Sequence, residues 1–466
     1  MDDQTQLLIR RLEAKVAQLE EMVDQLKAKV AQLQKENDRL LLEKLQLREQ
    51  LEEARRAEVR QAAPFRRDER EKIPPDEKKK PGRQIGHPGS CRSLPGHIDH
   101  TVEVPLERCP RCGGEVRDRR RLEQIIEEIP PVRPIVMKII TYEGCCARCG
   151  EVRSVHPLQT SLGQGAAKVQ LGPRALALAA VLNKAHGVTM RKTCKVLKDL
   201  TGLRLTPGGL SQALSRVARR VKVEYERLIE HIRGSPAVFA DETSWWVGGP
   251  GWWLWTFTTP KETVYRVDES RGSQVVEDVL GKNFAGMLVS DCLAAYDPIA
   301  CRKHKCFSHH LKAISNAKQF PDTSDSSYLR HCELLFKTAI ALYNARPQMT
   351  AESFTEKRSH IEAWVDRLLA QPLSQPQEER IRSRLLKQRS HLFGCLYEPA
   401  AEPTNNRAER SLRPAVIARK LSCGNKTLAG RDTWQVLASL GATCVQRCVD
   451  FTDFLASRLP LAAPAG

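Results

Sequence analysis

Two short apolar runs that each end in an aspartate constrain the fold of this chain more than any other feature. Residues 236–241 (PAVFAD) and 286–291 (GMLVSD) have the length and apolar content of buried strands. A tryptophan-rich hairpin, a further strand near 263–267 and a helix separate the two runs. A crossover that contains a helix suits a parallel fourth strand. We therefore expect an α/β core in which Asp241 and Asp291 stand at strand ends.

This order of elements matches the first half of a ribonuclease-H-like fold. Residues 306–400 read mainly as helices broken by prolines, and residues 405–457 read as helix again. A third acid, Glu409, stands where the late helical stretch begins. We expect an α-helical insertion between the second and third acids.

Three converging carboxylates indicate a two-metal site for phosphodiester chemistry. Mg²⁺ prefers carboxylate oxygens and water as ligands. Two such ions activate the attacking oxygen and stabilise the leaving one. We expect Asp241, Asp291 and Glu409 to hold two Mg²⁺ ions, with Mn²⁺ as a substitute. Any one of these acids alone would more often be a solvated turn cap, so the prediction depends on all three contexts.

Residues 7–52 carry the clearest periodicity. Leucine recurs every seven residues from Leu12 to Leu47, and mostly β-branched residues stand three positions before each leucine. This pattern, with Asn37 at one a position, favours a parallel two-stranded coiled coil. An isolated surface helix or an antiparallel pairing within the chain is the alternative, but the sequence has no second heptad array of this length. We expect residues 1–58 to form a homodimer.

The composition then becomes basic and rich in proline over residues 59–100. Proline and like charges prevent a packed core, so we expect an extended linker. Its residues 81–86 could lie in a DNA minor groove as short basic arms do. A solvated tether is the equal alternative.

Residues 101–160 contain two Cys-x2-Cys-Gly knuckles. The four cysteines are Cys109 with Cys112 and Cys146 with Cys149. Two such knuckles close a tetrahedral, structural Zn²⁺ site of ribbon type, with redox-active dithiols as the weaker alternative. The residues between them include strand-like runs at 125–129 and 135–140. Cys145 could replace its neighbour as a ligand.

Residues 165–230 read as a series of helices punctuated by glycine and proline. Helix, turn and polar-faced helix in series fit a helix-turn-helix module, in which Ser211 and Gln212 could face a DNA groove. On spacing alone, an ordinary helical connector fits equally well.

The whole chain of 466 residues is basic, with 74 Lys+Arg against 56 Asp+Glu and a net charge of +18. Such an excess favours a polyanionic partner, most often nucleic acid. No apolar run approaches the ~18–20 residues that span a membrane. The first residues also lack the basic start and apolar core of a signal peptide. We expect a cytoplasmic protein that binds DNA and no membrane.

Several motifs resemble those of the insertion-sequence-66 transposase family. They are Asp241-Glu-Thr-Ser-Trp, Trp252-Trp-Leu-Trp, Ser270-Arg-Gly, Val289-Ser-Asp291-Cys-Leu-Ala-Ala-Tyr296 and Pro403-Thr-Asn-Asn-Arg-Ala-Glu409-Arg-Ser-Leu-Arg413-Pro. The resemblance extends over nearly the whole chain. It implies an Asp-Asp-Glu triad that hydrolyses the ends of a DNA element and directs the freed 3′-hydroxyl at target DNA. It also implies a place in the bacterial nucleoid, an assembly on DNA and accessory transposition proteins.

Basic residues near the third acid are expected to contact DNA. Arg407, Arg410 and Arg413 lie along the expected Glu409 helix and could hold phosphates, with a solvated basic face as the alternative. Lys312 stands where the relatives usually carry arginine, and it keeps the charge but loses bidentate phosphate geometry.

Two further side chains are expected near the triad. His309 could support it, with a metal site shared with nearby cysteines as the alternative. Trp252 belongs to a group of tryptophans that could stack on an unpaired base, although packing within the hairpin is favoured.

The expected fold is therefore α/β and multi-domain. Its parts are a coiled coil (1–58), a linker (59–100), a zinc ribbon (101–160), a helix-turn-helix-like module (165–230), a ribonuclease-H-like core (235–320 and 401–466) and an α-helical insertion (321–400). Besides a transposase, two functions remain open: a catalytically silent, zinc-containing DNA-binding regulator, and a ribonuclease-H-type nuclease or resolvase.

Overall fold

The computed structural model describes residues 93–161 and 169–461, with residues 15, 21–27, 29–30, 32–33 and 36 near the N terminus. It divides into two units, 1–125 and 126–466. Most of the expected coiled coil and linker lies outside the described residues. No helix in the described part of the chain has the length and apolarity needed to cross a membrane.

The described part of the first unit, beyond its short helical pieces, is mostly irregular chain that contains the first cysteine knuckle. Neither strand expected between the knuckles forms: residues 125–129 and 135–140 have no regular secondary structure. Their apolar side chains, such as Ile126 and Val136, are exposed. A strand needs a paired neighbour and a face to bury, and β propensity alone does not supply these. The prediction of strands at 125–129 and 135–140, most of which belong to the second unit, was therefore wrong.

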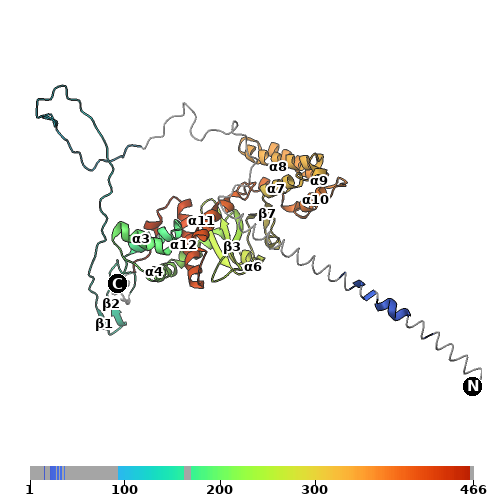
Figure 1. The fold of residues 1–466 in the computed structure, drawn as a ribbon, viewed down its shortest axis with the longest axis horizontal. Helices are drawn as coiled ribbons and strands as arrows, with labels where there is room; N and C mark the ends of the chain where they lie inside the picture. The colour runs from blue at the N-terminus through green and yellow to red at the C-terminus, as the bar shows by residue number, and fades with distance from the viewer. Residues whose placement is uncertain are drawn as a thin grey trace, which may run out of the picture. The chain divides into compact units, whose positions relative to one another are not determined.

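The second unit also contains a five-stranded mixed sheet with the order β5-β4-β3-β6-β7, which Figure 1 shows among the helices. Its strands are β3 (Ala237–Trp245), β4 (Trp252–Thr258), β5 (Thr263–Asp268), β6 (Met287–Ser290) and β7 (Arg302–Lys305). Strands β3, β4 and β5 are antiparallel, whereas β6 and β7 run parallel to β3. Helix α6 (Ser273–Leu280) lies in the crossover to β6. The expected hairpins and the parallel fourth strand are confirmed.

Strand β3 continues past the residue at which it was expected to end. Its pairing with β4 extends to Trp245 opposite Trp252, whereas its pairing with β6 stops at Phe239 opposite Val289. Asp241 therefore lies within a strand, two residues beyond the point where β3 loses its parallel neighbour. The prolonged pairing with β4 holds this part of β3 extended.

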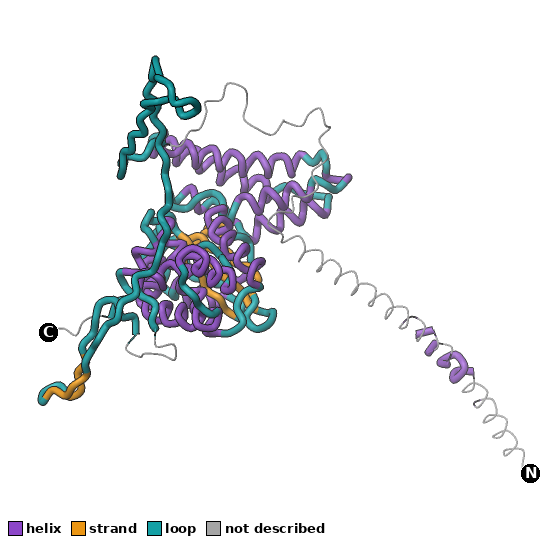
Figure 2. Tube along the Cα trace, turned by 60° about the vertical axis from the view of Figure 1, so that its left-hand side comes forward, coloured by secondary structure: helices purple, strands orange, loops and turns teal. Residues whose placement is uncertain are grey.

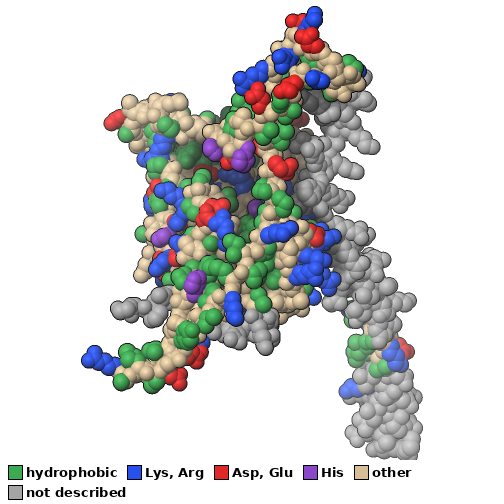
Figure 3. Space-filling view, turned by 90° about the vertical axis from the view of Figure 1, so that its left-hand side faces the viewer, with side chains coloured by type: hydrophobic (Ala, Val, Ile, Leu, Met, Phe, Trp, Pro, Cys, Tyr) green, Lys and Arg blue, Asp and Glu red, His purple; other side chains and the backbone are tan. Residues whose placement is uncertain are grey.

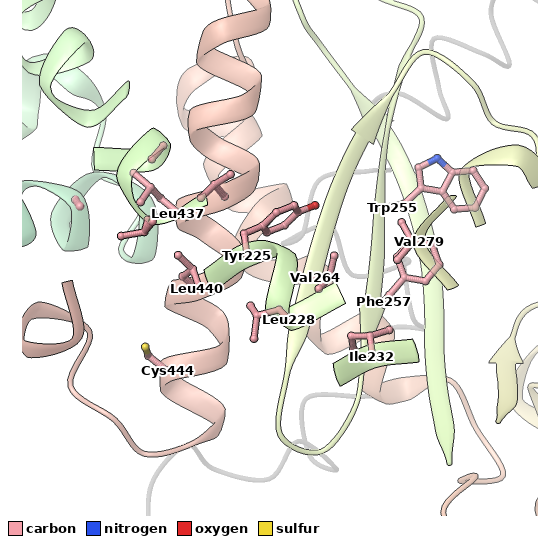
Figure 4. Close-up of a cluster of buried hydrophobic side chains, with 14 of the residues drawn as sticks. Tyr225, Leu228, Ile232, Trp255, Phe257, Val264, Val279, Leu437, Leu440 and Cys444 are labelled. Atoms are coloured by element: carbon pink, nitrogen blue, oxygen red, sulfur yellow. The ribbon is translucent and has the colours of Figure 1, made fainter. Parts of the chain in front are cut away.

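The two faces of the sheet are buried in different cores. On β3, Val238 and Ala240 face one core, and Ala237 and Phe239 face the other, as the alternation of strand side chains requires. The first core includes α5 (Lys222–Arg233). Figure 4 shows side chains of α5 packed against strand residues and against α12 (Leu428–Gln446).

The expected helices between residues 306 and 400 are confirmed. They are α7 (Phe307–Ala317), α8 (Ser327–Ala345), α9 (Ala351–Leu369) and α10 (Pro376–Lys387). Figure 1 shows α8 and its neighbours grouped together beside β7, and Figure 2 gives a second view of the helices and the sheet. Their apolar faces share the second core with Phe239 and Val289 of the sheet.

The helical segment before the sheet consists of α2 (Pro173–Ala180), α3 (Met190–Thr201) and α4 (Pro207–Arg220). Thr206 caps α4 by accepting the Gly209 N–H at 3.1 Å. Leu210 and Leu214 of α4 are buried in the first core, together with residues of the sheet and of α12. Ser211 and Gln212 occupy the exposed face of α4. The helices are as expected, and they share one core with the sheet.

Helix α12 (Leu428–Gln446) covers the edge strand β5. Alternate backbone N–H groups of β5 donate to side chains of α12: Thr263 to Thr443 (3.1 Å), Tyr265 to Ser439 (2.8 Å) and Val267 to Gln435 (2.9 Å). Four helical residues rise about 6 Å and two strand residues about 6.7 Å, so the two spacings match. The helix thereby satisfies donors that an open sheet edge would leave unpaired.

Candidate active site

Asp241 and Asp291 occupy corresponding positions on adjacent parallel strands. Phe239 pairs with Val289, and each aspartate follows two residues later. Because side chains alternate along a strand, both acids belong to the face of Phe239 and Val289. Asp241 Oδ1 accepts the Glu242 N–H and Asp291 Oδ1 accepts the Leu293 N–H, both at 2.9 Å. Backbone donors therefore orient both carboxylates.

Glu409 stands in the first turn of α11 (Asn406–Ser422), which packs against β3. The residue before this helix, Asn405, is fully buried and does not cap it. Its side-chain amide instead donates to the carbonyl of Ala240 at 2.7 Å. Its backbone N–H donates to Cys306 Sγ at 3.1 Å. Asn405 thus ties the helix that carries Glu409 to the residue that precedes Asp241.

The charges of the two other acids reach Asp241. Burial raises the pKa of Asp241 to about 7, and the negative charges of Glu242, Asp291 and Glu409 add to the rise. Carboxylates that repel one another in this way are suited to a divalent cation, and their oxygens are the donors that Mg²⁺ prefers. In the described ranges, however, no three His, Cys, Asp or Glu side chains are close enough together to form a metal cluster. The donor chemistry fits Mg²⁺, while the side chains are not drawn together around an ion.

A fourth acid supports the site from the opposite face of the sheet, and sequence reasoning missed it. Glu242 Oε1 accepts from Arg271 and Oε2 accepts from the Tyr296 hydroxyl, both at 2.9 Å. The Glu242 side chain is only 3% exposed. Each of these residues belongs to one of the motifs Asp241-Glu, Ser270-Arg-Gly and Asp291-Cys-Leu-Ala-Ala-Tyr296. The presence of all three residues in these motifs was the signal available in the sequence, but it did not show that their side chains are in contact.

His309 lies on α7 near the triad. Hydrogen bonding to Cys306 raises the pKa of the His309 imidazole, and the charges of Asp291 and Glu409 add to the rise against the effect of burial. His310, by contrast, is buried and stacks on Phe336 with 5.1 Å between ring centroids. The described residues around 301–310 form no separate metal cluster.

The arginines of α11 differ in their surroundings. Arg407 is ion-paired with Glu402, and its guanidinium lies 5.4 Å from the centre of the Phe239 ring. Arg410 and Arg413 are exposed, and no carboxylate in the described part of the chain forms an ion pair with them. Lys312 is exposed on α7. Figure 3 shows lysine and arginine side chains in several groups on one face of the molecule.

The tryptophans of the hairpin mainly pack within the protein. Trp245 and Trp255 are buried, at 3% and 0% exposure. Trp252 is half-buried, and the Arg431 guanidinium lies 5.3 Å from the centre of its ring. Packing accounts for these side chains in the free protein.

Each cysteine knuckle is a tight turn that brings two thiols together. In the first, Gly113 has φ 75° and donates its N–H to the Cys109 carbonyl at 2.8 Å. In the second, Gly150 (φ 73°) follows the turn between β1 (Glu143–Cys146) and β2 (Gly150–Arg153).

Hydrogen bonds within the knuckles favour thiolates. Backbone N–H groups of the turn, then the Cys112 thiol, lower the pKa of Cys109. Backbone N–H groups and then the Cys149 thiol lower the pKa of Cys146 in the same way. The structure therefore places Cys146, rather than Cys145, beside Cys149.

Comparison with known proteins adds a family. Residues 168–433 match the family model described as "Transposase IS66 family". The chain is also similar to two Sinorhizobium fredii (strain NBRC 101917 / NGR234) proteins, y4qI and y4jD, whose names assign no activity. It is 24% identical to y4qI over 80% of this chain and 74% of the relative. It is 24% identical to y4jD over 74% of this chain and 73% of the relative. The matched region includes Asp241, Asp291 and Glu409.

Proposed function

The chain belongs to the IS66 family of transposases, and on that premise we propose that it is a metal-dependent Asp-Asp-Glu polynucleotidyl transferase. Its substrates would be the two ends of an insertion sequence and a target DNA. The proposed reactions are hydrolysis of a phosphodiester at each element end and attack of the freed 3′-hydroxyl on a target phosphodiester. The sheet order and the helical insertion support a ribonuclease-H-like core for this chemistry.

The observation that supports the proposal is the electrostatic effect on Asp241 of two acids from distant parts of the sequence. Asp241 and Asp291 follow paired residues of parallel strands. The charges of Asp291 and Glu409 both contribute to the raised pKa of Asp241. A structural role does not require carboxylates whose charges repel one another, because their repulsion costs stability. A site that binds cations does require them.

The residues of the site would divide the work as follows. Asp241, Asp291 and Glu409 would hold two Mg²⁺ ions, or Mn²⁺ in their place. When bound, such ions activate the attacking oxygen and stabilise the leaving oxygen of a phosphodiester. Asn405 fixes the helix of Glu409 against β3, and Glu242 fixes the strand of Asp241 from the opposite face. His309, beside Asp291 and Glu409, is placed to hydrogen-bond a phosphate oxygen.

The remaining parts of the chain would handle DNA. We propose that Arg410 and Arg413, with Lys312, contact phosphates, and that Ser211 and Gln212 on the exposed face of α4 contact a groove. Arg407 and Trp252 would contribute only after leaving their present partners. A structural Zn²⁺ on the four knuckle cysteines, a homodimer through residues 1–58, and accessory transposition proteins remain part of the proposal.

Single substitutions of the triad test the proposal. The substrate is a duplex that carries the inverted repeat flanking the reading frame, with Mg²⁺ present. Asp241→Asn, Asp291→Asn and Glu409→Gln should each lower cleavage by about a thousandfold or more, because each removes a ligand charge on which the ions depend. Binding of the same duplex without divalent metal should stay within a few-fold of wild type.

A matched control is Glu226→Gln on α5, which removes an exposed carboxylate paired only with Lys222 on the same helix. It should cleave like the wild type. Normal cleavage by all three triad variants would contradict the proposal. A wild-type chain that binds the ends but never cuts them would favour the silent regulator. A chain that cuts branched or hybrid substrates without preference for the ends would favour a nuclease or resolvase.

A further inference from the structure

A cavity of about 340 Å³ lies beside the residue that follows Asp291. Cys292 lines one side of it. The other lining residues come from the end of α10, and they are Ser383, Arg384, Lys387 and Gln388. Helix α10 belongs to the insertion between the second and third acids, and it packs against α7. The insertion therefore reaches the immediate neighbourhood of the proposed active site.

The cavity carries an excess of positive charge. Lys387 Nζ lies 3.4 Å from Asp297 Oδ2, and the other oxygen of Asp297 lies 3.2 Å from Nζ of Lys305, which is fully buried. One carboxylate thus faces two ammonium groups. Arg384 adds a third cation, and no carboxylate in the described ranges forms an ion pair with it. Its side-chain contact is with the ring of His310, at 3.5 Å.

The neighbouring groups respond to this charge. Burial, followed by the positive charge of Arg384, holds the pKa of His310 well below its usual range. The His310 ring is therefore neutral beside Arg384, and it does not add to the repulsion. A neutral ring on one side and an open cavity on the other leave the guanidinium free to bind an anion.

A polar side chain in the cavity also lacks a partner. Gln388 is 3% exposed, and its Oε1 has no hydrogen-bond partner among the described residues. Buried amide groups are almost always hydrogen-bonded, and an unpaired one calls for an explanation. The oxygen and nitrogen of a glutamine amide exchange places by a half-turn, so Gln388 can present its NH₂ group to an acceptor.

We infer that α10 holds a DNA backbone phosphate in this cavity, next to the scissile phosphate at Asp291. Arg384 would donate a fork of N–H groups to two phosphate oxygens, Lys387 would add a point charge, and Gln388 would donate its amide. A phosphodiester matches the donors in charge and geometry. This inference rests on the proposed function. It makes the insertion a part of the substrate site.

Alanine variants of the two cations test this site in the full-length chain. Arg384→Ala and Lys387→Ala should each lower single-turnover cleavage of an element-end duplex by about tenfold, and each should reduce the salt dependence of binding by about one unit. Arg384→Lys should fall between Arg384→Ala and wild type, because it keeps the charge and loses the fork. The control Arg367→Ala removes an exposed arginine of α9 and should cleave like the wild type.

The contacted phosphate can be found by replacing single phosphates near the cut with uncharged methylphosphonates. One replacement should slow cleavage by the wild type about tenfold. The same replacement should not slow Arg384→Ala further, because that variant already lacks the guanidinium that contacts the phosphate. Equal effects of every replacement on both proteins, with cleavage by Arg384→Ala equal to Arg367→Ala, would overturn the inference. A second result would also overturn the inference. Inorganic phosphate would inhibit the wild type but not Arg384→Ala, while no methylphosphonate replacement affected the two proteins differently, and the cavity would then be a site for free phosphate.

Failure of the proposed function would look different. In that case the wild-type chain itself would not cut element ends in Mg²⁺, and the inference would fall with it. Cleavage by the wild type together with unaffected alanine variants would reject only the phosphate site.

Discussion

At the scale of single residues, the surroundings of Asp241 oppose its negative charge. It is partly buried among negative charges, and its raised pKa shows that the folded chain stabilises its protonated form relative to the unfolded chain. An ionised aspartate in such surroundings lowers stability, and under the proposed function this is the cost of a cation site. The effect of Asp241 on the stability of the metal-free protein can therefore be measured separately from its effect on cleavage.

Replacing Asp241 with asparagine should stabilise the metal-free protein above pH 7. The folded-state pKa is about 7 and the unfolded value is about 4, so the wild type loses stability as pH rises through this window and loses no more above it. Asparagine does not titrate, so between pH 5 and pH 8 it should gain about 2–3 kcal/mol of stability relative to wild type. Thermal unfolding in a chelator at pH 5 and pH 8 measures the difference. The stability of Asp241→Asn minus that of wild type should be larger at pH 8 than at pH 5. A smaller difference at pH 8 would contradict this account.

Tyr296 is predicted to act on the reaction through Glu242. Tyr296→Phe removes the hydroxyl that donates to Glu242 Oε2. Among the described residues, Arg271 then remains as the side-chain donor to that carboxylate. Because Glu242 is adjacent to Asp241, the triad should be held less rigidly. Cleavage should fall about tenfold while affinity for the element end is unchanged. Tyr343→Phe, which removes a hydroxyl bonded to the Pro399 carbonyl, is the control. Equal loss of DNA affinity and cleavage would point to a folding defect instead.

At the scale of elements, helices that reach across the sheet hold the site together. Helix α11 is tied to β3 through Asn405, and α12 lies along β5 through three side chains. Both helices come late in the sequence, so the edge strand β5 is covered only when the C-terminal part of the chain lies against it. We expect this edge of the sheet to depend on α12 for its stability.

Ser439→Ala tests the cover of the edge strand. Ser439 Oγ accepts the buried Tyr265 N–H at 2.8 Å, and alanine would leave that donor unpaired at a cost of about 1–3 kcal/mol. The matched control is Ser422→Ala. Each of the two serine hydroxyls donates to the carbonyl four residues earlier, Ser439 to Gln435 and Ser422 to Ala418. Ser422 is exposed, and no strand N–H in the described part of the chain donates to it. Urea denaturation should separate the two variants. Equal free energies of unfolding for Ser439→Ala and Ser422→Ala would show that water reaches the β5 edge and hydrogen-bonds the Tyr265 N–H.

The sequence predicted the elements better than their limits. Apolar runs, prolines and glycines were enough for the strands β3 to β6 and for the helices α6 to α11. The strand end at Asp241 was wrong because pairing with β4, which a local pattern does not encode, prolongs β3 to Trp245. The strands expected at 125–129 and 135–140 failed for the related reason that they have no paired neighbour.

The candidate site was predictable in its acids and unpredictable in its supports. Strand-end and helix-start contexts identified Asp241, Asp291 and Glu409. The roles of Asn405 and Glu242 depend on which face of the sheet each side chain meets, and the sequence does not state this. The cavity at Arg384 depends on the end of α10 lying beside Cys292. Such long-range packing comes from the whole fold.

At the scale of the whole molecule, the region that matches the transposase family is joined to cysteine knuckles and heptads that lie outside it. The family match extends over residues 168–433, so the cysteine knuckles and the heptads lie before it. Their purpose must be argued from their own chemistry. The heptads predict a dimer, and two dimerised active sites would suit an element with two ends.

The zinc prediction can now be made specific. Cys146 shares a hydrogen bond with Cys149 and has a lowered pKa, which suits a thiolate ligand. Cys145 precedes it on β1, where successive side chains point to opposite faces. The purified full-length protein should contain about one zinc per chain, because four thiolates complete one tetrahedral site.

Cys146→Ser should lose most of this zinc, whereas Cys145→Ser should keep it. Metal analysis of the purified variants measures the difference, and release of zinc on titration with a thiol reagent measures the number of thiolates involved. Because a structural ion stabilises only the folded state, the Cys146→Ser protein should also be cleaved faster by protease between residues 101 and 160. Zinc retained by Cys146→Ser and lost by Cys145→Ser would reverse the assignment of the ligand. Absence of zinc from the wild type would show that the four cysteines do not form a zinc ribbon.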